Sequence, residues 1–252
     1  MNPPELTGKI ALVTGASKGL GKAMSLALAK AGAKLALVSR DEKLLKDTAA
    51  AITALDSEAA VFPADVSDEA QVLALEKAVL ARFGRVHILI NNAGINLRKP
   101  ITEFTLEEWS RIQTTNVTSA FLMCRSFVPQ MKGQGYGRIL NITSMMSHIS
   151  LPGRTAYSTS KAALLGFTKA LALELAPEGI TVNGISPGPC STEINKALME
   201  NAELTQFFLS RIPVGRWGKP EEIGQLAVYL CSEAAGFTTG TDIIIDGGWT
   251  AQ

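Results

Sequence analysis

Near the start of the chain, the apolar run Ile10-Ala11-Leu12-Val13 is followed directly by Thr14-Gly15-Ala16-Ser17-Lys18-Gly19-Leu20-Gly21. The run predicts a buried strand, and the pattern from Leu20 to Ala31 predicts a helix after it. Glycines at 15, 19 and 21 permit a tight turn and a close backbone approach to a pyrophosphate at the helix N-terminus, whose dipole favours anions. The spacing is GxxxGxG rather than the standard GxGxxG, but its place between strand and helix favours a nucleotide site over a plain turn.

The rest of the chain repeats this alternation of strand and helix. Further strands are predicted at Lys34–Val38, Ala59–Phe62, Val86–Ile90, Arg138–Ile142, Thr181–Ile185 and Asp242–Ile245. Helices are predicted at Glu42–Leu55, Asp68–Phe83, Leu106–Met131, Ala156–Leu175, around Ile194–Leu209 and at Pro220–Ser232. The early strands are continuously apolar, as in parallel strands covered on both faces. We therefore expect an α/β fold: one Rossmann-type domain over residues 1–252, with a doubly wound parallel sheet of about seven strands and helices on both faces.

The bulk composition argues against several classes of function. The 252 residues carry a net charge of +1, so no charge excess predicts a nucleic acid or an anionic membrane as partner. The chain shows no apolar stretch of membrane-spanning length and no signal-peptide pattern. The cysteines, Cys124, Cys190 and Cys231, are odd in number and widely spaced, and two histidines are too few for a histidine-based metal site. We expect no metal and a cytoplasmic location.

Candidate catalytic residues follow the strands, because ligands bind at the carboxyl ends of strands in a doubly wound sheet. Ser144 follows the strand Arg138–Ile142, and its hydroxyl is suited to hold a substrate oxygen. Tyr157 and Lys161 are four residues apart and share one helix face. A nearby ammonium lowers a tyrosine pKa from its usual value of about 10, which would make Tyr157 a usable acid and base. The alternative is a surface pair on an amphipathic helix, because YxxxK is common by chance.

The segment Ser39-Arg40-Asp41 at the end of the second strand bears on the choice of nicotinamide cofactor. NAD enzymes usually place an acid there for the ribose 2′-hydroxyl. Arg40 instead offers a guanidinium to a 2′-phosphate, and Lys18 can approach the same phosphate from the Gly-rich turn. Asp41 is better suited to cap the following helix. We expect a preference for NADP(H), while Asp41 leaves use of NAD(H) open.

In order along nearly the whole chain, these motifs resemble the classical short-chain dehydrogenase/reductase family. The matching positions are the TGxxxGxG of Thr14–Gly21, Asp65 at the acid that contacts adenine, the NNAG of Asn91–Gly94, Asn116 in a long helix, Ser144, the YxxxK of Tyr157 and Lys161, and the PGxxxT of Pro187, Gly188 and Thr192. Several ordered motifs are far more specific than any one of them.

The resemblance implies a role for each of these residues. Tyr157 would exchange a proton with the substrate oxygen as hydride passes to or from nicotinamide C4, Lys161 would lower the Tyr157 pKa and hold the nicotinamide ribose, and Ser144 would orient the oxygen. Asn116 would help hold a water that links Lys161 to solvent. The implied cofactor residues are Gly15, Ser17, Lys18, Gly19, Leu20, Gly21, Ser39, Arg40, Asp65, Val66, Asn92, Ala93, Gly94, Tyr157, Lys161, Pro187, Gly188 and Thr192.

Four stretches, at 95–100, 141–147, 216–218 and 246–249, resemble bacterial gluconate 5-dehydrogenases and related sugar-acid dehydrogenases. That subgroup often has two adjacent arginines where this chain has Leu97-Arg98. Arg154 stands in a slot that faces substrate in the family; it either binds a carboxylate bidentately, with help from Arg98, or is a solvated loop arginine. We expect a sugar acid or polyol such as gluconate or 5-ketogluconate. The alternatives are a β-ketoacyl thioester or a hydrophobic ketone beside Met145 and Met146, and more remotely a non-catalytic dinucleotide sensor.

The remaining expectations concern packing and assembly. Residues 190–212 resemble the mobile substrate lid of the family, and family members usually form homotetramers. Cys190 is expected to be inert, since no basic residue adjoins it, and His148 to lie in a loop or at the pocket rim. Trp217 and Trp249 are expected to serve in packing or at an interface.

Overall fold

The computed structural model describes residues 5–252, apart from the side chains of residues 194 and 197. At its centre is a seven-stranded sheet in the order β3-β2-β1-β4-β5-β6-β7, in which every neighbouring pair of strands is parallel. The strands are β1 (Ile10–Thr14), β2 (Lys34–Ser39), β3 (Ala59–Pro63), β4 (Ile88–Asn91), β5 (Gly137–Ile142), β6 (Ile180–Pro187) and β7 (Asp242–Ile245). The strand order reverses beside β1, between β2 and β4, which is the switch point of a doubly wound sheet. The predicted fold class is confirmed.

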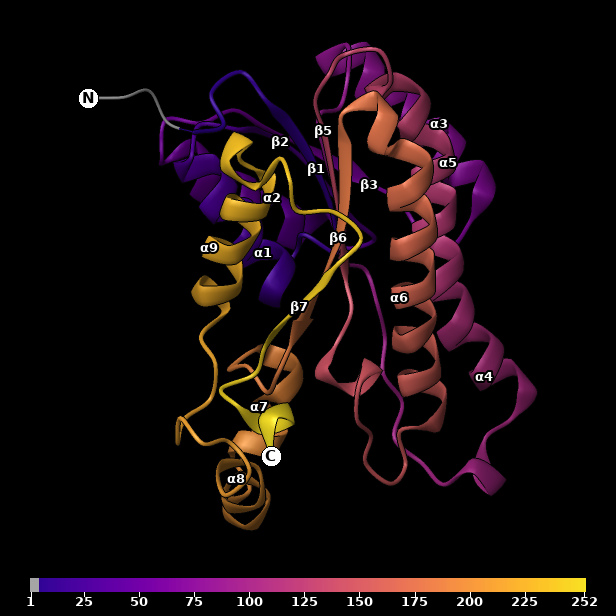
Figure 1. Ribbon diagram of the computed structural model, residues 1–252, viewed down its shortest axis with the longest axis vertical. Helices are drawn as coiled ribbons and strands as arrows, with labels where there is room; N and C mark the ends of the chain where they lie inside the picture. The colour runs from indigo at the N-terminus through magenta and orange to yellow at the C-terminus, as the bar shows by residue number, and fades with distance from the viewer. Residues whose placement is uncertain (1–4) are drawn as a thin grey trace.

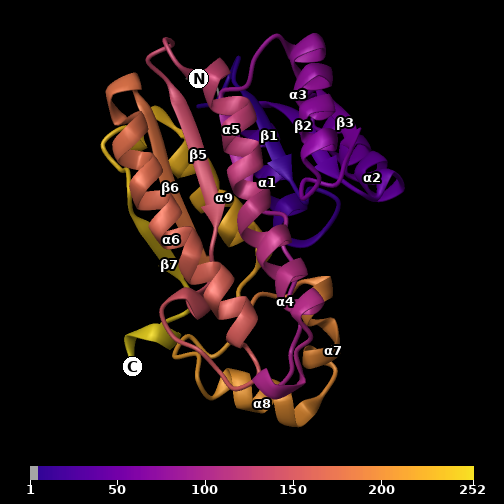
Figure 2. The ribbon, with the colours of Figure 1, turned by 90° about the vertical axis from the view of Figure 1, so that its right-hand side faces the viewer.

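Helices cover both faces of the sheet (Figures 1 and 2). They are α1 (Gly19–Lys30), α2 (Glu42–Thr53), α3 (Glu69–Phe83), α4 (Leu106–Gln113), α5 (Ser119–Met131), α6 (Thr155–Leu175), α7 (Lys196–Met199), α8 (Ala202–Leu209) and α9 (Pro220–Cys231). Helices α1, α2 and α9 lie on one face, and α3, α5 and α6 lie on the other.

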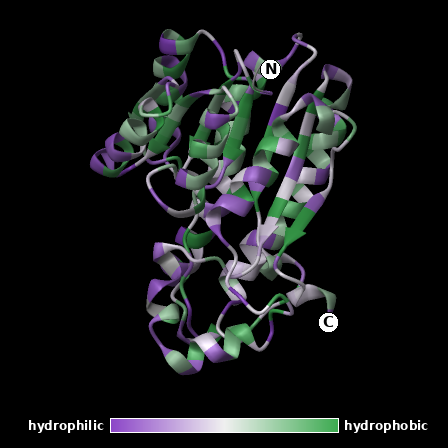
Figure 3. Ribbon diagram, turned by 90° about the vertical axis from the view of Figure 1, so that its left-hand side faces the viewer, coloured by the Kyte–Doolittle hydropathy of each residue, from purple (hydrophilic) through white to green (hydrophobic). Residues whose placement is uncertain are grey.

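Two apolar cores hold these layers together, because successive side chains of a buried strand point to opposite faces. Val13 packs with Met24 and Leu28 of α1, whereas its neighbour Leu12 packs with Phe127 of α5; all five residues are fully buried. Figure 3 shows the corresponding colouring, with hydrophobic strands in the centre and hydrophilic residues on the outer sides of the helices.

Two helical predictions differ in detail from the structure. The helix predicted over Leu106–Met131 is interrupted by a π turn at Thr114–Thr118, a widened turn that is often found at functional sites. The segment around Ile194–Leu209 divides into a 3-10 turn at Glu193–Asn195, α7 and α8. Asn201 separates the last two, because its side chain accepts a hydrogen bond from Leu204 N and so starts a new helix.

The carboxyl ends of the strands point toward the end of the molecule where α7 and α8 lie, at the bottom of Figure 1. This is the end at which a doubly wound sheet binds ligands. Across residues 5–252, we find no helix with both the length and the apolar character needed to cross a bilayer.

Candidate active site

The Gly-rich turn after β1 is shaped by its contacts with the turn after β4. Gly15 has a φ of +64°, and a Cβ added there would lie 2.7 Å from Asn92 Nδ2. The Asn92 amide donates to the carbonyls of Thr14 at 2.9 Å and of Gly15 at 3.2 Å. A Cβ on Gly21 would collide with the Gly15 carbonyl. Glycine is therefore required at 15 for conformation and contact, and at 21 for close packing of helix against turn.

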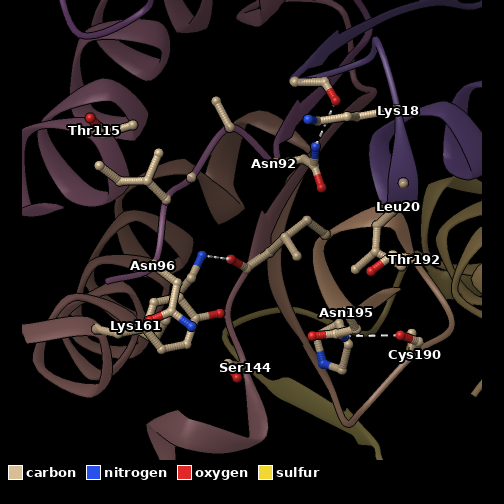
Figure 4. Close-up of a pocket in the computed structure, with 18 of the residues that line it drawn as sticks. Lys18, Leu20, Asn92, Asn96, Thr115, Ser144, Lys161, Cys190, Thr192 and Asn195 are labelled. Carbon is tan, nitrogen blue, oxygen red and sulfur yellow. Dashed lines mark hydrogen bonds between the residues drawn. The ribbon is translucent and has the colours of Figure 1, made fainter. Parts of the chain in front are cut away.

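The N-terminus of α1 is suited to an anion. Lys18 is its N-cap residue and makes no side-chain capping bond, and the first turn carries no acidic residue. No carboxylate of this first turn competes for the first backbone N–H groups of the helix, although the Glu193 carboxylate lies nearby, 3.6 Å from where a Cβ on Gly19 would be; the helix dipole favours a negative group there. Figure 4 shows Lys18 and Leu20 at one end of the pocket, across from Lys161 and Ser144.

The end of β2 separates the roles of Arg40 and Asp41. Asp41 Oδ1 accepts a hydrogen bond from Leu44 N at 3.0 Å, so this aspartate caps α2 as predicted. The exposed Arg40 lies 3.6 Å from Asp65 through its Nη1. Burial alone would raise the pKa of Asp65, but hydrogen bonds from Ser67 and the charge of Arg40 outweigh it and hold that pKa below its usual range. Arg40 thus projects beside the cavity on a side chain held only by an exposed ion pair.

The candidate catalytic residues come from two elements, the segment after β5 and helix α6. Ser144 ends the segment after β5, while Tyr157 and Lys161 lie one turn apart on α6. The Ser144 hydroxyl accepts from Met146 N at 3.1 Å, and it opposes the rise that burial causes in the pKa of Tyr157. Lys161 Nζ is buried and donates to the Ile142 carbonyl at 2.6 Å. The alternative interpretation of YxxxK, a surface pair on an amphipathic helix, is therefore wrong.

Asn116 lies behind this group, in the π turn between α4 and α5. Its Oδ1 accepts from Ile95 N at 2.7 Å, and its Nδ2 donates to Ile95 O and to Ser160 Oγ, both at 2.9 Å. A Cβ on Gly94 would lie 3.2 Å from Asn116 Oδ1 and 3.6 Å from Lys161 Nζ. The side chain of Asn116 thus fixes the loop after β4 next to the buried ammonium.

The electrostatics around Tyr157 differ from the expectation that Lys161 lowers its pKa. Burial raises the pKa of Tyr157, and the groups that oppose this rise are the Ser144 hydroxyl, Arg154 and Arg98, in that order. Lys161 Nζ lies 5.8 Å from the centre of the Tyr157 ring and is directed to the Ile142 carbonyl. Burial also lowers the pKa of Lys161 to about 8. In this geometry the charges of Arg154 and Arg98 oppose the effect of burial on the Tyr157 pKa, while Lys161 Nζ is directed to the Ile142 carbonyl.

Arg154 and Arg98 meet because their loops are joined by a hydrogen bond from Lys99 N to the Gly153 carbonyl, at 3.3 Å. Arg154 is only 7% exposed, and burial together with the nearby Arg98 lowers its pKa to about 10. Neither arginine has a carboxylate partner among residues 5–252, whereas the neighbouring Lys99 is paired with both carboxylate oxygens of Glu108, at 2.7 and 2.8 Å. The solvated-loop interpretation of Arg154 is therefore wrong.

One cavity of about 880 Å³ connects these groups, from the Gly-rich turn to α8. Of the predicted site residues, all line it except Gly21 and Asn116, which lie behind its wall. Met145 and Met146 both face it and also pack in a cluster with Leu198 and Phe208. The lining also includes residues that no motif marks, among them Asn96 and Thr115. Asn195, Leu198 and Phe208 belong to the predicted lid segment 190–212, and Trp217 is predicted only to serve in packing or at an interface.

The remaining side chains of this region are accounted for by packing. Phe208 contacts Trp217 and Trp249 with ring centres 5.4 and 5.6 Å apart, as expected for packing tryptophans. Burial raises the pKa of Cys190 to about 12, so its thiol is unreactive as expected. His148 pairs with Asp242 at 2.7 Å. Within the described part of the chain, no group of three or more His, Cys, Asp or Glu residues is arranged to hold a metal.

The chain is similar to several known proteins over nearly its whole length. A family-wide sequence model described as Enoyl-(Acyl carrier protein) reductase matches residues 15–250. The chain is 38% identical over 253 residues to the 2-dehydro-3-deoxy-D-gluconate 5-dehydrogenase of Dickeya dadantii, covering 100% of this chain and 99% of that protein. It is 39% identical over 246 residues to a 3-oxoacyl-(acyl-carrier-protein) reductase of Synechocystis sp., covering 96% and 97% of the two chains.

A solved structure extends the similarity to the fold. The gluconate 5-dehydrogenase from Burkholderia cenocepacia, in complex with NADP and tartrate, gives a TM-score of 0.95 at 33% identity and covers 100% of this chain and 98% of that chain. The same family is indicated by the parallel sheet, the Gly-rich turn, Ser144 and the YxxxK pair of Tyr157 and Lys161. Since these matches span nearly the full length of both partners, the chain belongs to the short-chain dehydrogenase/reductase family of NAD(P)-dependent oxidoreductases.

Proposed function

We propose that this enzyme uses NADP(H) to interconvert a carbonyl and a secondary alcohol on a sugar acid such as gluconate or 5-ketogluconate. The observation that carries the substrate class is the pair Arg154 and Arg98, two cations without a carboxylate partner in the described chain, in the same cavity as Ser144 and Tyr157. A carboxylate on the substrate would supply the missing counter-ion, and a planar guanidinium binds it bidentately.

NADP(H) fits the other end of the cavity. The first turn of α1 carries no acidic side chain, and glycine at 15 and 21 lets the helix pack closely against the turns after β1 and β4. The dipole of α1 favours a pyrophosphate at this end. Arg40 and Lys18 are placed for a 2′-phosphate, while Asp41 is engaged in capping α2. Bound there, the cofactor supplies or accepts the hydride.

The roles of the chain's own residues follow from their contacts. Ser144 Oγ accepts from Met146 N, so its own O–H remains to be donated to the substrate oxygen beside Tyr157. In reduction, Tyr157 donates its phenolic proton to the carbonyl oxygen as that oxygen becomes an alcohol; in oxidation it takes the proton back. Lys161, whose pKa burial lowers to about 8, holds the cofactor ribose and returns a proton to Tyr157, with Asn116 fixing the loop beside it.

A β-ketoacyl thioester is the second candidate substrate, and a specific observation favours it. One part of the cavity wall is apolar, since Met145, Met146, Leu198 and Phe208 pack together along it. The Synechocystis relative is named for that activity. A thioester would lay its acyl chain on this wall and leave Arg154 without a partner.

The deciding experiment follows NADPH oxidation by the purified protein with 5-ketogluconate, an acetoacetyl thioester and a neutral ketone, with NADH in parallel. We expect fastest turnover of 5-ketogluconate with NADPH. The control is Tyr157→Phe, which removes one oxygen atom and should abolish turnover while sparing NADPH binding. Turnover confined to thioesters or neutral ketones would refute the sugar-acid assignment, and unchanged turnover in Tyr157→Phe would refute the role of Tyr157.

We also propose that residues 190–212 act as a lid and that the enzyme is a cytoplasmic homotetramer. Thr192, Asn195, Leu198 and Phe208 of this segment line the cavity, so their movement would open it. Large apolar side chains are exposed on α5 and α6 and beside the edge strand β7, in particular Phe121, Leu173 and Phe237. The three cysteines are free and buried, which suits a reducing compartment. A monomeric mass by light scattering at micromolar concentration would contradict the tetramer.

A further inference from the structure

Asp242, the first residue of β7, makes contacts that no motif predicts. Its carboxylate accepts from Thr143 Oγ1 and from Ser186 Oγ, both at 2.6 Å, and it pairs with His148 Nε2 at 2.7 Å. The Asp242 side chain is only 9% exposed. Gly184, its neighbour on β6, provides the space, because a Cβ there would collide with the Asp242 carboxylate. The carboxylate therefore lies across the sheet rather than in solvent.

These contacts tie down both ends of the turn that carries Ser144. At its start, Thr143 Oγ1 lies 2.6 Å from the Ile185 carbonyl and 2.9 Å from Ser186 Oγ, and Ser186 Oγ lies 2.9 Å from the Ser144 carbonyl. Thr143, Ser144 and Ser186 are all buried. Each hydroxyl has a single proton, so when both donate to Asp242 the turn is held through the Thr143 side chain, next to Ser144, and through Thr143 N, which donates to the Ile185 carbonyl at 2.9 Å.

At the other end of the turn, His148 follows the 3-10 helix Met145–Ser147 and its backbone N donates to the Met145 carbonyl at 3.0 Å. Its ring reaches the same carboxylate at Oδ2, the oxygen that Ser186 also contacts, whereas Thr143 binds Oδ1. Met145 and Met146 lie between the two tethers and form part of the cavity wall. A shift of this turn would move both the Ser144 hydroxyl and the wall on which substrate rests.

We propose that Asp242 and His148 are positioning residues, which hold the turn from Thr143 to His148 so that the Ser144 hydroxyl meets Tyr157. This inference rests on the proposed role of Ser144. Neither residue lines the cavity, so both act through the turn and not on substrate or cofactor. The contribution is geometric: a misplacement of about 1 Å in a catalytic group can slow a reaction about 100-fold.

The test is a double-mutant cycle that measures kcat for Asp242→Ala, Ser144→Ala and the double variant. We expect Asp242→Ala to lower kcat about 10- to 100-fold, to leave the dissociation constant of NADPH within about twofold, and to have almost no further effect on Ser144→Ala. Equal losses in both backgrounds, or a loss below twofold, would overturn the proposal. The matched control is Glu233→Gln, at an exposed acid far from the turn, which should keep wild-type kcat.

The turn can also be probed through His148 and by hydrogen–deuterium exchange. If Asp242→Ala does not fold, His148→Ala replaces it, since the His148 side chain is 30% exposed and its removal leaves the core intact. Hydrogen–deuterium exchange of peptides covering 143–148 needs no turnover. Faster exchange there in either variant supports the tether, and unchanged exchange refutes it. A wild-type enzyme that turns over no carbonyl would refute the proposed function alone, because the exchange result still decides the tether.

Discussion

Replacing Arg154 with methionine should separate substrate binding from stability. In Arg154→Met the carboxylate of a sugar acid loses a buried, charge-assisted partner. Truncating one member of such a pair costs about 2–5 kcal/mol, which corresponds to roughly 30- to several-thousand-fold in kcat/KM. A neutral ketone has no group for Arg154 to bind, so its reduction at neutral pH should change by less than about threefold. Tyr157 stays protonated there, because burial already raises its pKa.

The same substitution should stabilise the protein measured without substrate. Arg154 is 7% exposed, and its pKa falls to about 10 because burial disfavours the charge. Against an ordinary value of 12.5, this corresponds to a penalty on the order of 3 kcal/mol in the folded state. Methionine fills much of the same volume without a charge. We expect Tm to rise by several degrees, since 1 kcal/mol moves the Tm of a chain of this length by about 2–4 °C.

The assay pairs NADPH oxidation on 5-ketogluconate and on a neutral ketone with thermal denaturation. Arg85→Met is the matched control, because Arg85 is exposed, bonds only to Gln134 and lies near the amino end of β4. It should leave both activities unchanged. Equal loss on the acid and on the neutral ketone, or a lower Tm in Arg154→Met, would refute the assignment of Arg154 as an unpaired carboxylate site.

Three further predictions concern the cofactor, the pH dependence of stability and the thiols. Combining Arg40→Ser with Lys18→Ala should lower kcat/KM for NADPH by about 10- to 1000-fold, since hydrogen bonds to charged groups are worth about 1.5–3 kcal/mol; a matching loss for NADH would contradict it. His87 has its pKa lowered to about 4 by burial, Lys9 and Arg85, and its Nδ1 accepts from Ile10 N, so the fold holds the ring neutral. As pH falls from about 6.5 to 4, the His87 ring takes up a proton in the unfolded chain but not in the folded one, so the free energy of unfolding should drop by on the order of 1–2 kcal/mol after solvent screening. In His87→Asn, urea melts should show a free energy of unfolding that changes less with pH over this range. Because burial raises the Cys190 pKa to about 12, native protein should not react with a thiol reagent until denatured.

The sequence predicts the cofactor end of this site well, because local rules determine it. Strand Ile10–Thr14 is wholly buried, and the glycines that follow are required by backbone conformation and contact. The glycine motif in the sequence is therefore the direct record of what the folded turn requires. Asp41 is similar: the helical pattern that follows it identifies a cap, and Leu44 N is its partner. The positive φ of Gly15, the contact of Gly21 with Gly15 and the Asp41 cap depend on neighbours within a few residues, which the sequence displays directly, whereas the contact of Gly15 with Asn92 does not.

The substrate end is less predictable, because contacts between distant segments determine it. The depth of Arg154 depends on the packing of the loop containing Lys99 against Gly153, which no local pattern encodes. The π turn at Asn116 arises where that side chain binds both backbone groups of Ile95, 21 residues away in sequence. Asp242 reaches Thr143 across 99 residues. In each case the residue type is visible in the sequence but its partner is not.

The arrangement of charge in the cavity gives the strongest reason to prefer an acid as substrate. Any bound substrate displaces water from around Arg154, so the charge of this arginine must find a partner on the substrate or remain desolvated and unpaired. A neutral ketone or a thioester gains contact with the apolar wall of Met145 and Met146, but such contact gives only modest discrimination between substrates. A buried polar group left without its partner discriminates far more strongly. The unpaired Arg154 should therefore dominate specificity, and the apolar wall should determine how the carbon chain of an acid lies against Ser144 and Tyr157.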